Sequence, residues 1–175
     1  MFFLQTPRLA LIETPLDVVR TRLAKTDFDA PVPTPAGEIT VHFPEAWPGD
    51  ELVLFPMYLE SPDAPPSWGG VAVELATNRA VGGAGCKGMP DASGRVEIGY
   101  GLSPEAQGRG YATELVEALV DWLLARPEVS AVTAETSVEN RASQRVLEKC
   151  GFVRVGERTD EEDGPLYLWE KVRTC

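Results

Sequence analysis

A glycine-containing loop between two regular segments is the feature that most constrains how this chain can fold. Residues 94–102 (GRVEIGYGL) alternate polar and apolar side chains as a β-strand does, and residues 111–125 repeat apolar side chains at the helical period. The sequence QGRG, residues 107–110, leads directly into the helical segment. The chain must therefore bring a strand end, a tight loop and a helix N-terminus together, which favours a fold that mixes strands with helices.

Two interpretations of this loop are open from its residues alone. Its glycines can simply form the turn that lets the helix begin. Alternatively, the unpaired N–H groups at the helix start can bind a phosphate, which glycine lets approach closely, while Arg109 adds a positive charge. A dinucleotide fingerprint is not met, because Thr113 stands where G-x-G-x-x-G requires its third glycine.

The other regular segments alternate between strands and helices. Alternating or short apolar runs predict strands over residues 5–13, 69–77, 79–88 and 129–137. Helical patterns occupy residues 14–25 and 140–150, and residues 152–172 are typical of a hairpin with an acidic tip. This order predicts one domain, residues 1–175, of the α/β (α+β) class around a single mixed sheet.

The first predicted helix carries signals for both its start and its buried face. Thr14 is the expected N-cap and Pro15 the expected first helical residue. Leu16, Val19 and Leu23 share one face of this helix, so we expect them to pack inward. In the later helix the expected buried stripe consists of Leu115, Leu119, Trp122 and Leu123.

Residues 31–68 form a segment that is interrupted by proline too often for a long helix. We predict loops, short helical turns and at most one brief strand there. The segment contains Trp47 and several other large apolar residues, which makes it too apolar for an interdomain linker. It is therefore predicted to cover a pocket.

Charge and hydropathy exclude several classes of protein. The formal net charge of −11 and a pI near 4.6 argue against a nucleic-acid binder and are compatible with a cationic substrate, although solubility alone also explains an acidic surface. No apolar run approaches the ~20 residues that span a bilayer, so no membrane association is expected. The N-terminus lacks the features of a secretion signal, and a cytoplasmic location is expected.

The cysteine and histidine content argues against a metal centre. Cys86, Cys150 and Cys175 are far apart and lack C-x-x-C spacing, so neither a disulfide framework nor a zinc site is indicated. The single histidine, His42, lies in a strand-like stretch, where a structural or surface role is expected. We therefore expect no metal and no serine hydrolase triad.

Two motifs resemble those of a known family. Gln107-x-x-Gly110-x-Ala112 resembles the Q/R-x-x-G-x-G/A acyl-coenzyme-A signature of the GNAT superfamily of N-acetyltransferases. Residues 97–119 look like its RimJ/RimL branch, and residues 140–152 resemble the second hallmark of that branch, N-x-x-S-x-x-V-L-E-K-x-G-F. Two motifs in the right order favour the phosphate-binding interpretation of the loop.

The resemblance implies a fold and a cofactor site. The implied fold is a mixed, mostly antiparallel sheet that splays open after its fourth strand, here residues 96–102, and is flanked by helices. The pantetheine arm of acetyl-CoA would lie in the split, and backbone amides of the glycine loop would hold its pyrophosphate. The residues implied in cofactor binding are Tyr100, Leu102, Gln107, Gly108, Arg109, Gly110, Tyr111, Ala112, Asn140 and Ser143.

The implied reaction is direct attack of a neutral amine on the acetyl thioester, with a backbone N–H near Tyr100 or Leu102 available for the oxyanion. Glu97 is the candidate base that deprotonates the amine, and the alternative is that Glu97 points away and pairs with an arginine. Many family members carry a tyrosine where this chain has Leu147. Ser143 is therefore the candidate that orients or relays the proton for the departing thiolate.

The function implied is acetyl-CoA-dependent N-acetylation of a primary amine, either a small cationic amine or a peptide N-terminus. The alternative is a non-catalytic sensor or scaffold that binds acyl-CoA, and a phosphotransferase is disfavoured because the glycine loop lacks G-K-[ST]. Trp47 and the hairpin tip at residues 160–163 would flank the acceptor side, although a solvated turn also explains four acids there. A homodimer is compatible with the resemblance.

Overall fold

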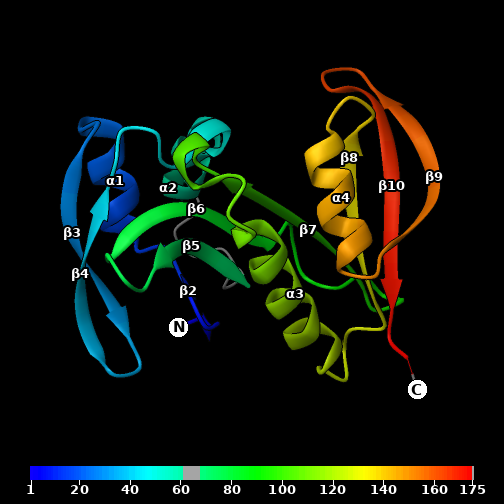
Figure 1. Ribbon diagram of the computed structural model, residues 1–175, viewed down its shortest axis with the longest axis horizontal. Coiled ribbons are helices and arrows are strands. Elements are labelled where there is room, and N and C mark those ends of the chain that lie inside the picture. Colours follow the sequence, from blue (N-terminus) through cyan, green and yellow to red (C-terminus); the bar gives the residue numbers. More distant parts are fainter. Residues whose placement is uncertain (61–67, 175) are drawn as a thin grey trace.

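The computed structural model describes residues 1–60 and 68–174, so residues 61–67 of the proline-rich segment and Cys175 lie outside the described residues. The described chain forms one sheet in the order β1-β2-β5-β6-β7-β8-β10-β9, with β3 and β4 joined at its side (Figure 1). Its strands are β1 (Phe3–Gln5), β2 (Leu9–Ile12), β3 (Phe28–Thr34), β4 (Gly37–Phe43), β5 (Gly69–Glu74), β6 (Arg79–Cys86), β7 (Arg95–Leu102), β8 (Ala131–Ser137), β9 (Val153–Asp160) and β10 (Gly164–Val172). Its helices are α1 (Leu16–Ala24), η1 (Gly49–Leu54), α2 (Phe55–Glu60), η2 (Pro104–Ala106), α3 (Tyr111–Leu124) and α4 (Arg141–Lys149).

The sheet is split between β7 and β8, as the resemblance to the GNAT superfamily implies. These two strands run parallel and pair only between residues 95–97 and 131–133. Beyond Glu97 they diverge, and Figure 1 shows the open V between β7 and β8. The remaining full ladders are antiparallel, so the expected class and the splayed sheet are confirmed. The strand before the split is the seventh rather than the fourth, because residues 5–13 contribute to two strands and residues 28–43 add a hairpin.

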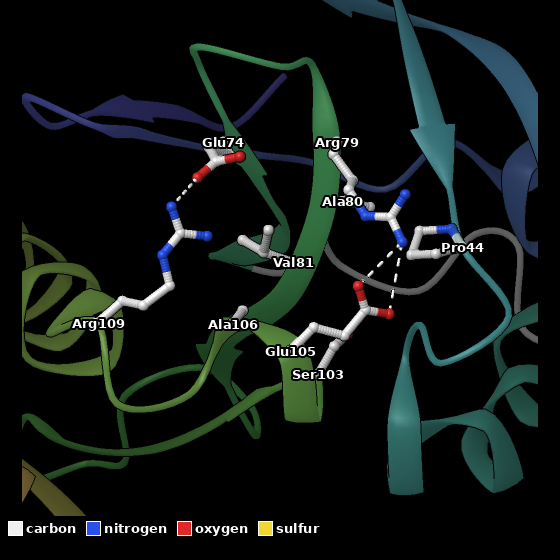
Figure 2. A pocket seen from close by; sticks show the side chains of 9 residues that line it. All are labelled: Pro44, Glu74, Arg79, Ala80, Val81, Ser103, Glu105, Ala106 and Arg109. Carbon is white, nitrogen blue, oxygen red and sulfur yellow. Dashed lines mark hydrogen bonds and ion pairs between the residues drawn. The ribbon is translucent and has the colours of Figure 1, made fainter.

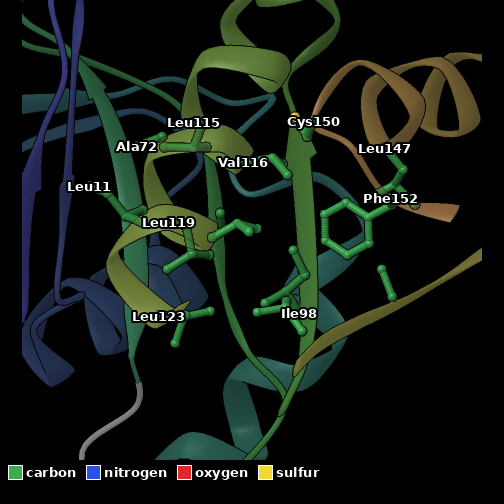
Figure 3. Packing of buried hydrophobic residues seen from close by; sticks show 14 of the residues in the cluster. Leu11, Ala72, Ile98, Leu115, Val116, Leu119, Leu123, Leu147, Cys150 and Phe152 are labelled. Atoms are coloured by element: carbon green, nitrogen blue, oxygen red, sulfur yellow. The ribbon is translucent and has the colours of Figure 1, made fainter. Parts of the chain in front are cut away.

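Two apolar cores lie on opposite faces of the sheet, because successive side chains of a strand point to opposite sides. On one face α3 packs against residues such as Leu11, Ala72 and Ile98 (Figure 3). On the other face α1, η1, α2 and the β3–β4 hairpin cover Ile12 and Val71. The two layers leave the glycine loop and the split exposed at the rim between them.

Helix α3 buries the face that its sequence predicts. Leu115, Leu119 and Leu123 have no exposed surface, and Trp122 is partly buried at the edge of the same stripe. Burial of three leucine side chains contributes roughly 1.5–3 kcal/mol each. This packing fixes the position of the helix N-terminus, where the glycine loop ends.

The prediction of at most one brief strand in the proline-rich segment is wrong. Residues 28–34 and 37–43 form an antiparallel hairpin, in which Pro31 faces Thr40 and Pro33 faces Glu38. Proline is tolerated here because β3 pairs with β4 alone in the described chain, so a missing N–H can face outward. A prediction that treats every proline as the end of a strand therefore misses this hairpin.

The predicted start and buried face of α1 are also wrong in part. Pro15 is the N-cap rather than the first helical residue, and no side chain caps this end, so Thr14 does not. Val18 and Val19 are buried, but Leu23 is 46% exposed. Arg22 takes an inward position because its guanidinium donates to backbone carbonyls of Lys25, Thr26 and Glu45.

The predicted boundaries of α4 are confirmed. Asn140 Oδ1 accepts a hydrogen bond of 3.1 Å from the Ser143 N–H, which makes Asn140 the N-cap. Gly151, with a φ of 82°, ends the helix in the left-handed conformation that favours glycine. No helix among the described residues is long and apolar enough to cross a membrane.

Candidate active site

The glycine loop presents a row of free backbone donors at the start of α3. Gly108 and Gly110 both have left-handed φ angles, 73° and 79°, and Gly110 is the N-cap. The Gln107 N–H donates to the Pro104 carbonyl, and the next paired amide is that of Glu114, which donates to Gly110. In the described chain the N–H groups of residues 108–113 have no acceptor. Clustered free amides at a positive helix end are suited to an anion such as pyrophosphate.

A partly exposed network that the sequence did not indicate holds this loop and the start of α3 against residues 6–8, just before β2. Glu114 accepts hydrogen bonds from Thr6 Oγ1 (2.6 Å), from Arg8 N (2.9 Å) and from Arg8 Nε (2.6 Å). Arg8 Nη1 also donates to the Arg109 carbonyl at 2.9 Å. Burial raises the pKa of Glu114, but the hydrogen bonds from Thr6 and Arg8 outweigh it and hold the pKa below its usual value. The glycine loop is therefore anchored both through Glu114 in the first turn of α3 and through the Arg109 carbonyl.

Arg109 is held in an ion pair rather than free to move. Its Nη2 lies 2.7 Å from Glu74 Oε1 (Figure 2). Its guanidinium also lies 4.5 Å from the ring centre of Tyr111. The Tyr111 hydroxyl donates to the same carboxylate. Hydrogen bonds from Thr77 and Tyr111, with the nearby Arg109, lower the pKa of the buried Glu74. The loop therefore presents the backbone amides of Arg109 and Tyr111, while their side chains point to Glu74.

Figure 2 shows the shallow pocket beside this network, between the loop and the start of β6. Besides Glu74 and Arg109 it is lined by Arg79, whose Nη2 lies 3.1 Å from Glu105 Oε2, and by the buried Ser103. Each guanidinium that lines it is paired with a carboxylate. The pocket is therefore electrically balanced and lies on the β6 side of the loop, away from the split.

The edge of β7 offers backbone groups to the split. Glu97 O accepts from Lys87 N and Ser103 N donates to Val81 O, so these residues direct their backbone groups toward β6. Alternate residues of an antiparallel strand point the other way, which turns the backbone groups of Tyr100 and those of Leu102 toward the split. The Leu102 carbonyl accepts 3.1 Å from Gln107 Nε2, so the side chain of Gln107 braces the strand end.

The opposite wall of the split is α4, and Tyr100 reaches across to it. Its hydroxyl donates to the Ser143 carbonyl at 3.1 Å, and burial raises the pKa of Tyr100 to about 12. Leu147, which replaces the usual tyrosine, has no exposed surface. The structure thus places Tyr100, Asn140 and Ser143 around one opening. The sequence indicated only the backbone of Tyr100 as part of the site. The motif of α4 gives no sign that a tyrosine hydroxyl reaches this helix from β7.

Glu97 lies on the other face of β7, and neither of the two predicted arrangements describes it fully. Its Oε1 is 2.5 Å from Lys87 Nζ, so it is paired with a lysine of the adjoining segment rather than with an arginine. The Lys87 side chain also passes 3.5 Å from the position of a Cβ on Gly99. A role as base therefore requires this ion pair to open.

A second carboxylate lies on the same face as Glu97 and was missed in the sequence. Glu51 of η1 places Oε2 3.5 Å from the position of a Cβ on Gly83, and Gly83 pairs with Gly101 of β7. Burial raises the pKa of Glu51 above its usual value. No pattern along the chain connects η1 with β7, so this contact is visible only in the fold.

The expected aromatic and acidic flanks of the acceptor side differ from their prediction. Trp47 is 2% exposed, and its Nε1 donates to the Gly82 carbonyl, so its ring belongs to the second core and does not face an acceptor. At the hairpin tip Asp160 accepts from Arg158, which also binds Glu135. The Arg158 hydrogen bond is the main cause that lowers the pKa of Asp160 to about 2. Two of the acids near this face are therefore already paired.

In residues 1–60 and 68–174, no group of three or more His, Cys, Asp or Glu side chains is placed to hold a metal ion. Cys150 is buried near the Thr113 carbonyl, and burial raises its pKa to about 11, which keeps the thiol protonated at neutral pH.

Comparison with known proteins agrees with this arrangement. The family model described as an acetyltransferase (GNAT) domain matches residues 25–153. The uncharacterized N-acetyltransferase YjdG of Bacillus subtilis (strain 168) is 38% identical over 87 residues, which are 50% of this chain and 51% of that protein. The chain thus spans about half the length of the curated relative it matches.

Two solved structures have the same fold. The acetyltransferase (GNAT family) from Bacillus anthracis superposes with a TM-score of 0.69 at 17% identity and covers 98% of this chain and 99% of its own. The spermidine N-acetyltransferase from Vibrio cholerae, in complex with CoA and spermine, gives a TM-score of 0.60 at 19% identity over 69% of this chain and 73% of its own. At these identities the likeness shows the fold alone.

Proposed function

Because the chain belongs to the GNAT acetyltransferase family, we propose that it transfers an acetyl group from acetyl-CoA to a primary amine. The observation that carries the proposal is the row of free amides at residues 108–113, beside the open edge of β7. The amides fit a pyrophosphate, and the outward backbone groups of β7 fit the amides of a pantetheine arm. A Cβ on Gly108 would meet nothing within 4 Å, so the loop is open to a ligand.

The residues proposed to hold acetyl-CoA divide between the two walls of the split. Tyr100 and Leu102 offer backbone groups from β7, and the loop from Gln107 to Ala112 offers the amides. Asn140 and Ser143 lie at the start of α4, and the cap that Asn140 forms is compatible with a further contact to the ligand. When bound, acetyl-CoA supplies an activated acetyl group as a thioester.

The chain's own residues would then supply proton transfer and charge stabilisation. A backbone N–H of Tyr100 or Leu102 faces the split and is available to an oxyanion. Ser143 is proposed to orient or relay a proton. The Tyr100 hydroxyl, which is bonded to the Ser143 carbonyl, adds a tyrosine hydroxyl to the site, whereas the usual tyrosine is replaced by Leu147. Glu97 remains a candidate base once its pair with Lys87 opens.

The acceptor is proposed to be a small cationic amine or a peptide N-terminus. The net charge of −11 supports a cationic acceptor, and the spermidine N-acetyltransferase from Vibrio cholerae, which has the same fold, was solved in complex with CoA and spermine. Assignment to the RimJ/RimL-like branch rests on the two sequence motifs in residues 97–119 and 140–152. The cytoplasmic location and a homodimer belong to the same proposal.

Calorimetric titration with acetyl-CoA, with ATP and NAD as controls, tests the cofactor site. Saturable binding of acetyl-CoA alone is expected, followed by release of free CoA thiol when a cationic amine is added. Binding without thiol release across an amine panel would favour the non-catalytic sensor. Absence of binding by a folded sample would mean that the loop only starts a helix.

A further inference from the structure

Glu51 lies on the face of the sheet opposite α3, against β6, which is the neighbour of the strand β7 that borders the split. Its Oε2 is 3.5 Å from the position that a Cβ on Gly83 would take. Gly83 is paired with Gly101, and paired residues of an antiparallel ladder present the same face. A Cβ on Gly101 would meet nothing within 4 Å. The carboxylate therefore borders an open patch of sheet over Gly101.

The open patch has a glycine floor. Gly101 is exposed and Gly99 meets only the Lys87 side chain, so a bound molecule can approach the backbone of β7 closely there. Gly83 is buried, because the Gly70 carbonyl lies 2.9 Å from its Cβ position, and it forms the edge of the patch beside Glu51. Lys87 crosses the far side of the patch, where its Cε lies 3.5 Å from a Cβ on Gly99 while its Nζ pairs with Glu97. One side of the patch is thus electrically balanced, and the other side ends at Glu51.

Glu51 has no cation of its own within the described residues. Neither an ion pair nor a hydrogen bond joins its carboxylate to another side chain there, whereas Glu97 is paired with Lys87. The titratable side chain that faces it is Tyr58 of α2, whose pKa is raised by burial and by Glu51; β5 and β6 present backbone at this point. Burial of a carboxylate without a partner is unfavourable, so a positively charged ligand would stabilise it.

We infer that Glu51 binds the ammonium group of the acceptor over Gly101 and removes its first proton. This inference rests on the proposed acetyl transfer, because Gly101 lies between the two residues whose backbone is proposed to hold the cofactor arm. The proton passes from the ammonium to Glu51 and then to solvent. The neutral nitrogen forms the C–N bond to the acetyl carbon as the C–S bond breaks, and the second proton from nitrogen ends on the departing thiolate.

The kinetic test compares Glu51→Gln with wild type and with Asp50→Asn, an exposed acid next to it on η1. The acceptor is whichever of spermidine, kanamycin or a basic peptide with a free N-terminus wild type acetylates fastest, measured by thiol release. Glu51→Gln should lower kcat/KM for the amine by about tenfold or more and remove the acidic limb of its pH profile. Glu51→Asp should recover part of the rate, and Asp50→Asn should behave as wild type.

Two results would overturn the inference: amine kinetics of Glu51→Gln within about twofold of wild type, or loss of the acidic limb in Glu97→Gln instead. Stability separates a structural role from the inferred one. Since the carboxylate is desolvated and unpaired, Glu51→Gln should melt at the same temperature as wild type or higher. A clearly lower melting temperature would mean that Glu51 supports the fold, which also contradicts the inference.

Calorimetric titration of spermidine into CoA-saturated protein gives a readout that needs no turnover. Wild type should bind spermidine at least about tenfold more tightly than Glu51→Gln, while the affinity of both for acetyl-CoA stays equal. Binding that depends on Glu51 without any acetyl transfer would keep the ammonium site and overturn the proposed function. Equal binding by both proteins, or by neither, would overturn the site.

Discussion

Single residues of the glycine loop meet two requirements at once, one on backbone conformation and one on the space beside the free amides. Gly110 has a left-handed φ of 79° at the start of α3, and under the proposed function it must also leave room for a ligand beside the free amides. Tyr111, one residue later, sends its ring back to Glu74 and leaves only its N–H at the loop surface. The sequence motif therefore reflects what the backbone needs at Gly110 and Tyr111. The direction of the Tyr111 side chain is set by Glu74, which lies far away in the sequence.

Gly110→Glu should abolish binding of acetyl-CoA. The substitution adds a negative charge beside the free amides and costs about 1–2 kcal/mol for a left-handed non-glycine residue. Gly164→Glu is the matched control, because Gly164 has a φ of 71°, open space around its Cβ position and a place in the β9–β10 turn. Calorimetry should show binding lost in the first variant alone, and equal affinity in both would contradict the loop assignment.

Tyr100→Phe should lower kcat with little change in the KM for acetyl-CoA. It removes the hydroxyl that bonds the Ser143 carbonyl, and loss of a positioned proton donor costs a factor of about 100 or less when a relay through Ser143 remains. Because burial raises the pKa of Tyr100 to about 12, the hydroxyl is protonated throughout a kinetic assay between pH 6 and 10. Tyr167 of β10, which packs partly buried against the same core, is the control, and Tyr167→Phe should keep the kcat of wild type. A kcat equal to wild type in Tyr100→Phe would exclude the Tyr100 hydroxyl from the reaction.

At the scale of elements, the sequence predicted best where local signals and packing agree. The unit from β7 through α4 was predicted because its strands alternate polar and apolar residues, Asn140 caps α4 and glycines mark the helix boundaries. The β3–β4 hairpin was missed because Pro31 and Pro33 argue against a strand although they lie in an outer one. The buried face of α1 was predicted only in part, because the Arg22 guanidinium donates to buried backbone carbonyls. Contacts between segments far apart in the chain decide both features, and the local sequence carries no signal for such contacts.

The candidate site divides in the same way. The loop and the cap at Asn140 were predicted because each is built from residues close in sequence. The partners of Glu114 and Glu74, and the approach of Glu51 to Gly83, join segments far apart along the chain. The sequence of this chain therefore predicts the glycine loop, but only the structure shows which distant residues hold the loop in place.

Asn140→Ala should destabilise the protein through α4. Loss of a helix N-cap costs about 1 kcal/mol, which corresponds to a fall of roughly 2–4 °C in Tm for a chain of this size. Asn140→Asp keeps an oxygen that can accept from the Ser143 N–H, so it should keep most of the stability. Differential scanning calorimetry measures both, and equal loss in the two variants would show that the cap does not stabilise α4.

At the scale of the whole molecule, the carboxylates of Glu74 and Glu114 join the neighbouring strands β2 and β5 to the glycine loop and the start of α3. Glu74 at the end of β5 and Glu114 on α3 both have a pKa below the usual 4.5, because they accept hydrogen bonds from Thr77 and Tyr111 and from Thr6 and Arg8, respectively. A depressed pKa in the folded state contributes stability above the unfolded value. That contribution disappears as the pH falls through the folded pKa.

Acid should therefore weaken the fold below about pH 4.5. Urea unfolding between pH 7 and pH 3 should give a free energy of unfolding that falls steadily below this value. Glu114→Gln should be less stable than wild type at pH 7 and should lose less on acidification, because it has no proton to take up. Parallel pH profiles for the two proteins would show that Glu114 does not contribute to the pH dependence.

The split between β7 and β8 also bears on how the protein avoids self-association. Strand edges with unpaired backbone groups are templates for aggregation, and opening a sheet in the middle creates two more of them. Here those two edges face each other within one molecule, where α4 and the Tyr100 side chain narrow the approach. The outward-facing strands carry other protection, prolines in β3 and alternating charges in β9. A fold that keeps a binding edge permanently open thus hides that edge from other copies of itself.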